Sequence, residues 1–297
     1  MHEIPSVTGT AEGPLFVLLT EITLGIPLFS KVLALLLTMV ASILIYFIGI
    51  SNDLFPRSSL LAPSFLVFFL SWNQSFLSLT PLQPAIILVL ISIFTIMRIY
   101  GQQDPFRLVF SSALSLGLAS LFYLPAVFFL LMIWLSFLTY RITSWREWII
   151  TVIGFTLPYI YLATWLLLTD DHFNNLLPII ESMVDFRIFS QYLEPVSWVW
   201  IIGLISMLFL ASVTGANAIQ DKLISIRRKT FIMVDFLLVC MAVILLSGAS
   251  FGLSLQFLYI PLSFFMASLI GFTKRSVFIE LLFALFLGTL VVIRIIA

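Results

Sequence analysis

The residues best suited to chemistry form one short polar segment. Asp170, Asp171 and His172 are consecutive and follow an apolar run. Paired carboxylates can hold a divalent cation or act as a general base, and an imidazole titrates near neutral pH. The same triplet would also suit the place where an apolar span ends at water. We therefore predict Asp170, Asp171 and His172 as candidate catalytic residues, with a plain span boundary as the alternative.

Two further acidic residues lie inside apolar runs. Asp235 comes six residues after Lys229. Glu280 comes five residues after Arg275. Ionisable side chains within a membrane are costly and are functional candidates for that reason, but a lysine or arginine at the boundary can extend its apolar stem to reach them. We predict an ion pair at both intramembrane carboxylates, with a proton or ion pathway as the alternative.

Asp53 follows Asn52 in a segment that also contains Pro56. These residue types predict an ordinary turn with an Asx cap ahead of the next helix. An acidic residue in a first loop also invites comparison with glycosyltransferases that use lipid-linked sugars. In those enzymes the acid faces the outside, whereas the charge distribution described below places Asp53 inside.

Metal and cofactor chemistry has little support in the composition. Cys240 is the only cysteine, and His2 and His172 lie in distant segments. These residues cannot build a thiolate cluster or a site of several imidazoles. We expect no cofactor and no bound metal. Because the net charge is zero and no basic stripe is present, we expect no nucleic-acid partner either.

The elements that must position these residues are membrane helices. Of 297 residues, 62% are hydrophobic and 9% are charged, and the mean hydropathy is +1.19. A helix needs about 20 apolar residues to cross a bilayer. We predict an all-α, polytopic transmembrane bundle of about ten spans, forming a single integral domain over residues 1–297. The seven tryptophans and 30 phenylalanines are interpreted as lipid-facing and interfacial filling.

The run from Leu108 to Tyr140 is counted as two crossings. As one helix its 33 residues would be about 50 Å long, against a hydrocarbon core of about 30 Å. Arginines flank both of its ends, and cytoplasmic loops collect Lys and Arg. We predict a break near Tyr123, Leu124 and Pro125, because proline disfavours a continuous helix. The other runs are Leu28 to Ile50, Leu60 to Leu79, Leu82 to Tyr100, Trp148 to Leu168, Ser197 to Gly215, Thr230 to Gly248, Phe251 to Phe272 and Val277 to Ile296.

This count places most basic residues on the inside. Both termini and the acidic loop from Thr169 to Val196 are then outside, with Lys31, Arg187 and Arg294. Apolar residues recur at helical spacing in residues 169–196, which predicts an amphipathic interfacial helix there, with a re-entrant or exposed loop as the alternative. The 11 inside residues are Arg57, Arg98, Arg107, Arg141, Arg146, Lys222, Arg227, Arg228, Lys229, Lys274 and Arg275.

Small residues predict where helices approach closely. Gly117 is accompanied by Ser112, Ala113 and Ser120, and Gly203 by Ser206. Such patches allow backbones to come together within a bundle.

Several motifs resemble an uncharacterised family of multi-pass membrane proteins from Bacteroidota. They are Arg98-Ile99-Tyr100, the stretch from Gly117 to Pro125, Trp145-Arg146-Glu147-Trp148-Ile149 and Leu157-Pro158-Tyr159. Some members carry a carotene-cleaving oxygenase label, which we reject because such oxygenases hold iron with several histidines. The family begins with one further apolar segment, so a truncated start would explain the outward N-terminus.

For function, the sequence favours a non-enzymatic protein of the bacterial inner membrane. We expect it to transport a small or lipid-like molecule, or to support assembly of an envelope machine, with the lipid bilayer as its surroundings and its oligomeric state open. The alternative is a glycosyltransferase or polymerase-like enzyme acting on lipid-linked glycan at the outer face, with Asp170, Asp171 and His172 at its site.

Overall fold

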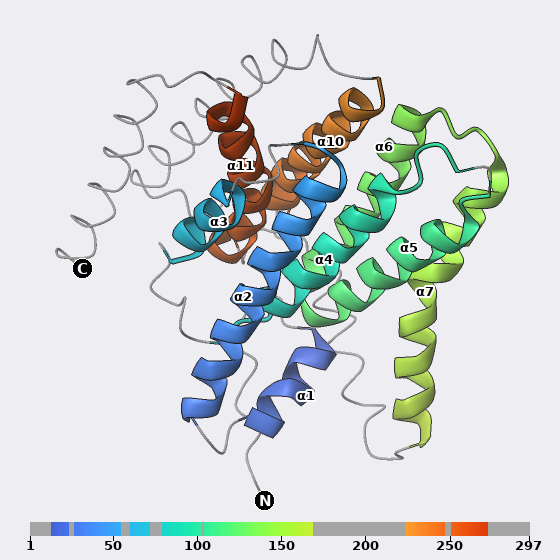
Figure 1. Cartoon of the computed structure of the whole chain (residues 1–297). Coiled ribbons are helices and arrows are strands. Elements are labelled where there is room, and N and C mark those ends of the chain that lie inside the picture. Colours follow the sequence, from blue (N-terminus) through green and yellow to red (C-terminus); the bar gives the residue numbers. More distant parts are fainter. Residues whose placement is uncertain are drawn as a thin grey trace, which may run out of the picture.

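The computed structural model describes residues 13–23, 27–54, 60–71, 79–102, 104–168, 224–246 and 251–272. The elements in these ranges are helical, which confirms the all-α class (Figure 1). They are α1 (Pro14–Thr23), α2 (Pro27–Ser51), α3 (Leu61–Ser71), α4 (Leu82–Met97), α5 (Phe106–Phe122), the 3-10 helix η2 (Leu124–Phe129), α6 (Leu130–Tyr140), α7 (Trp145–Leu168), α10 (Ile224–Leu246) and α11 (Phe251–Phe272).

Two helices in the described ranges are long and apolar enough to cross a membrane. They are Leu28–Ser51 and Trp145–Trp165. The figure of about ten spans goes beyond this finding and stays a prediction. α1 was not among the predicted runs, because its ten residues are half the length of a span.

The break predicted near Tyr123 is confirmed. α5 ends at Phe122, and Tyr123 takes an extended backbone with φ −139° and ψ 105°. Pro125 then lies in the first turn of η2, which leads directly into α6. The proline removes a backbone donor that a continuous helix would need. The apolar run therefore folds as two arms joined at Tyr123.

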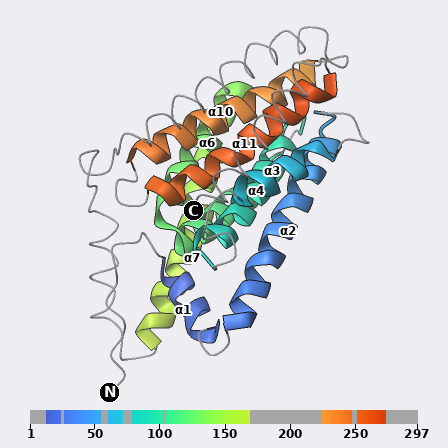
Figure 2. The ribbon, with the colours of Figure 1, turned by 90° about the vertical axis from the view of Figure 1, so that its left-hand side faces the viewer.

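The helices pack mainly along a few long seams. α5 packs on α4 and α7, α10 on α6 and α11, and α11 on α3. α10 and α11 lie side by side in both views (Figures 1 and 2). α2 and α7 lie on opposite flanks of the bundle (Figure 1).

The two flanking helices expose many large apolar side chains. Such a surface costs free energy in water and costs none against lipid. On α2 they are Leu28, Phe29, Val32, Leu35, Leu36, Met39, Val40, Ile43 and Phe47. On α7 they are Trp145, Ile149, Val152, Ile153, Ile160, Tyr161, Trp165 and Leu168.

The small-residue patch on α5 forms the contact with α7. A Cβ atom on Gly117 would lie 2.5 Å from the carbonyl oxygen of Phe155, and one on Gly154 would lie 2.9 Å from the carbonyl oxygen of Phe110. The hydroxyl oxygens of Ser120 and Tyr159 lie 2.7 Å apart across the same seam. This confirms the predicted close approach at Gly117.

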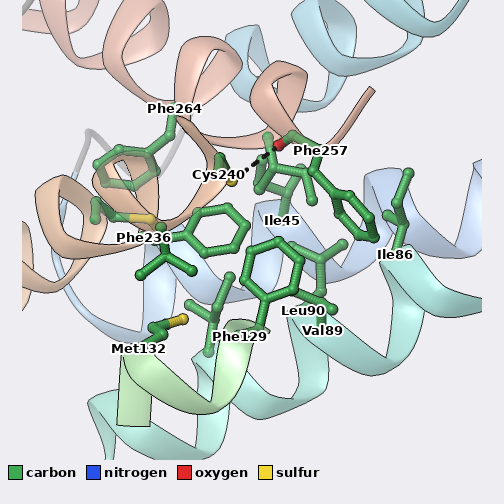
Figure 3. Close-up of a cluster of buried hydrophobic side chains, with 14 of the residues drawn as sticks. Ile45, Ile86, Val89, Leu90, Phe129, Met132, Phe236, Cys240, Phe257 and Phe264 are labelled. Carbon is green, nitrogen blue, oxygen red and sulfur yellow. Dashed lines mark hydrogen bonds between the residues drawn. The ribbon is translucent and has the colours of Figure 1, made fainter. Parts of the chain in front are cut away.

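Aromatic side chains fill much of the core, which corrects their interpretation as surface filling. Phe129 of η2 lies between Phe236 of α10 and Phe257 of α11, with ring centroids 5.3 Å and 4.8 Å away. Ile45 of α2 and Leu90 of α4 are buried in the same cluster (Figure 3). An all-apolar helix gives no periodic signal to show which phenylalanines face inward.

Candidate functional site

Asp235 lies half-buried on α10, at the seam with α6. Its Oδ2 atom accepts a hydrogen bond of 2.9 Å from the Oγ1 atom of Thr139, near the end of α6. A neutral hydroxyl thus orients the carboxylate without neutralising it. The two residues are 96 positions apart in the chain, so only the packing of α6 on α10 brings them together.

The ion pair predicted between Asp235 and Lys229 does not form among the described residues. Side chains six residues apart on an α-helix differ in direction by about 240° around the helix axis. Asp235 and Lys229 therefore do not lie on one face of α10. Thr139 occupies the position expected for the cation. Arg228, seven residues before Asp235, is the basic residue on the same face of α10.

Two tyrosines and Arg228 lie where this seam ends, at the last residue of α6 and the first turns of α10. The rings of Tyr100 and Tyr140 lie 5.5 Å apart, and the guanidinium carbon of Arg228 lies 5.6 Å from the Tyr100 ring centroid. Arg228 and Asp235 both act electrostatically on Tyr140. The Tyr140 hydroxyl is buried without a hydrogen-bond partner, which is a costly state for a donor.

Asp53 lies at the same end of the bundle, after the last turn of α2. Burial lowers the pKa of Lys229, which precedes the apolar part of α10, and the Asp53 carboxylate opposes that effect. Asp53 has a positive φ of 52°. The Asn52 side chain donates to the Ile48 carbonyl at 2.8 Å. The predicted turn is present, but Asn52 caps the end of α2 instead of the start of the next helix.

We call this end of the bundle the basic end, defined by Arg98, Tyr140, Arg228 and Lys229. α5 begins at Phe106, shortly after Arg98, and α7 begins at Trp145, shortly after Tyr140, so both helices start on this side. Lys31, in the first turns of α2, is at the other end. Seven of the eight basic residues in the described ranges therefore lie at the basic end: Arg98, Arg107, Arg141, Arg146, Arg227, Arg228 and Lys229.

The opposite end of the bundle is closed by neutral contacts. The Gly13 amide, ahead of α1, donates to the Phe122 carbonyl at 2.9 Å. The Tyr123 hydroxyl lies 2.6 Å from the Ser254 hydroxyl of α11. Both side chains are fully buried. The break after α5 is thus held by α1 on one side and α11 on the other.

Glu147 is a buried acidic residue that sequence reasoning missed. It is 6% exposed on the face of α7 that also carries Thr151, Gly154 and Pro158, and its Oε2 atom has no hydrogen-bond partner. The four-, three- and four-residue spacing of these buried positions is a helical stripe. That spacing, read together with Gly154, is the signal that could have identified it.

Several predicted residues lie outside the described ranges. They are Asp170, Asp171, His172, Glu280, Gly203 and the segment 169–196. A Gly-x-Ser-x-Gly pattern at residues 248–252 begins after α10 and ends in the first turn of α11. Gly248, Ala249 and Ser250 of this pattern lie outside the described ranges.

The described site is a small set of polar side chains at a helix seam. It offers one oriented carboxylate, one guanidinium stacked on an aromatic ring and a buried phenol. The chain matches no protein-family model, no curated protein and no solved structure.

Proposed function

We propose that this chain is a polytopic protein of the bacterial cytoplasmic membrane, with about ten spans, that transports a small or lipid-like molecule. In this proposal the interior of the bundle binds the transported molecule and does not carry out a covalent reaction. We also propose that the chain is related to the uncharacterised Bacteroidota family of multi-pass membrane proteins.

The observation that carries this proposal is the Asp235 carboxylate. It lies between two helices and is held by the Thr139 hydroxyl instead of a cation. Charged side chains within membrane helices are expensive and mark substrate or ion paths when they face the bundle. A carboxyl group held by a neutral donor, with no bound cation among the described residues, leaves room for an incoming cationic group or proton.

The exposed apolar faces of α2 and α7 support a membrane location. Their large side chains lie on opposite flanks, where lipid would surround the bundle. The basic end supports an orientation with Arg98, Arg141 and Arg228 toward the cytoplasm, since basic residues collect on that side.

The test uses a deletion strain and two matched variants. Asp235→Asn keeps the acceptor oxygen for Thr139 and removes the charge. Asp53→Asn removes a charge at the same end outside the helices, and asparagine tolerates its positive φ. The small-molecule and lipid contents of the cells and of the medium are compared across strains that express each variant at equal levels in the membrane.

If a compound is transported through the Asp235 site, its distribution between the cells and the medium should change in the deletion strain. We call this change the displacement of that compound. Asp235→Asn should leave that displacement uncorrected, while wild type and Asp53→Asn correct it. If Asp235→Asn corrects it fully, the proposal is wrong.

A further inference from the structure

The start of α10 combines a basic cluster with an exposed apolar stripe. Arg227, Arg228 and Lys229 are consecutive in its first two turns. Arg227 is exposed, and Phe231 and Leu238 further along are 50% and 55% exposed. Steps of four and seven residues keep these three side chains on one face of the helix.

Among the residues that the structure describes, the positive charge in this cluster exceeds the negative charge that faces it. Asp53 acts on Lys229, and Asp235 is engaged by Thr139. Arg228 contacts the Tyr100 ring, and no acidic side chain in the described ranges pairs with it. The N-terminus of a helix also carries a partial positive charge, so three cations there are unfavourable without an anion.

The apolar stripe decides which anion fits. From Arg227 to Leu238 the helix rises about 16 Å, which is close to the thickness of one leaflet of a hydrocarbon core, about 15 Å. A phosphate at Arg227 and its neighbours would place an acyl chain along Phe231 and Leu238. A free phosphate ion would leave that stripe without a role.

We propose that the first turns of α10 bind an anionic phospholipid, with its phosphate at the exposed Arg227, within the positive field of Arg228 and Lys229, and an acyl chain along Phe231 and Leu238. Anionic headgroups are attracted to basic residues at a membrane surface. The site requires that α10 contacts lipid, and it is independent of whether the protein transports anything.

The experiment compares two lipids that share acyl chains. Purified protein in a neutral detergent is titrated with dioleoyl phosphatidylglycerol or dioleoyl phosphatidylcholine, and bound lipid is counted by native mass spectrometry. We expect binding of the anionic lipid to be tighter by about tenfold or more, a factor that corresponds to about 1.4 kcal/mol. The combined variant R227Q/R228Q/K229Q should bind both lipids alike.

Arg107→Gln is the matched control, because Arg107 is exposed at the same end of the bundle and should not alter the preference. Phe231→Ser should weaken the binding of both lipids equally, since both have the same acyl chains. If the combined variant does not fold, Arg227→Gln alone, at an exposed side chain, should still reduce the preference.

Equal binding of the two lipids by the wild-type protein would overturn the proposal. So would a preference that survives in the combined variant, or one lost equally in Arg107→Gln. Displacement of the lipid by millimolar inorganic phosphate would also overturn it, because the site would then be one for a free anion.

Discussion

Gly117 of α5 lies directly against the Phe155 carbonyl of α7, so close that a Cβ atom would come within 2.5 Å of the oxygen. The neighbour is a backbone atom, which cannot move aside as a flexible side chain could. The two helices therefore keep this contact only while position 117 has no side chain. The same seam carries the Ser120–Tyr159 contact one turn further on.

Gly117→Ala should force α5 and α7 apart. Overpacking of this kind costs about 1–3 kcal/mol, and we expect a lower midpoint of thermal unfolding in detergent. Ser111→Ala, at a half-exposed position of the same helix, should leave the midpoint unchanged. Equal midpoints for Gly117→Ala and Ser111→Ala would show that the seam is looser than described.

Thr139→Val should destabilise the protein by removing the donor to Asp235. A carboxylate left without its partner at a helix seam costs about 1–3 kcal/mol. Thr156→Val removes a hydroxyl that bonds only its own helix at an exposed position, so it serves as the control. Denaturant titration gives the free energy of unfolding of both variants, with and without the added substitution Asp235→Asn. The loss of stability caused by Thr139→Val should be smaller when Asp235 is replaced by Asn.

Tyr123 and Ser254 should be energetically coupled. Their hydroxyl oxygens are 2.6 Å apart and buried, and interhelical hydrogen bonds in membranes are worth about 0.5–1.5 kcal/mol. A double-mutant cycle of Tyr123→Phe and Ser254→Ala measures this coupling from unfolding midpoints. Strictly additive effects would mean that the contact contributes nothing.

Met39→Arg should prevent correct insertion of α2. Met39 is 61% exposed in the middle of that helix, and an arginine at the centre of a span costs about 2.5–3.5 kcal/mol. Met39→Ala is the apolar control. The amount of folded protein in the membrane fraction is the readout, and an unchanged amount with Met39→Arg would place this face in water.

The proposed orientation can be read by cysteine labelling. In a Cys240→Ala background, a cysteine at exposed Ser144 should react with an impermeant maleimide only in inverted vesicles. A cysteine at Glu21, exposed on α1, should react in intact spheroplasts. The reverse pattern would invert the orientation and leave the fold unaffected.

Features with a local cause could be predicted from the sequence. Pro125 and the flanking arginines were enough to locate the break at Tyr123, because proline acts on its own neighbourhood. Gly117 indicated a close approach for the same reason, although its partner on α7 was not predicted. The α1 helix was missed because its ten residues are too few for a span.

Features created by packing could not be predicted. Thr139 and Asp235 are far apart in the chain, and the nearer candidate, Lys229, points to another side of the helix. Phe129 and Phe236 look the same in the sequence as phenylalanines that face outward, because almost all of their near neighbours in the sequence are apolar too. Tyr140 gained its place beside Arg228 only through the docking of α6 on α10.

The backbone hydrogen bond of Gly13 bears on the order in which the protein folds during synthesis. Its amide bonds to the carbonyl of Phe122, which the ribosome adds more than one hundred residues later. A hydrogen bond of this kind cannot form until α5 has left the ribosome and entered the bundle. α1 is synthesised before α5 but makes this contact only afterwards, so a pause in synthesis before Phe122 would leave α1 undocked.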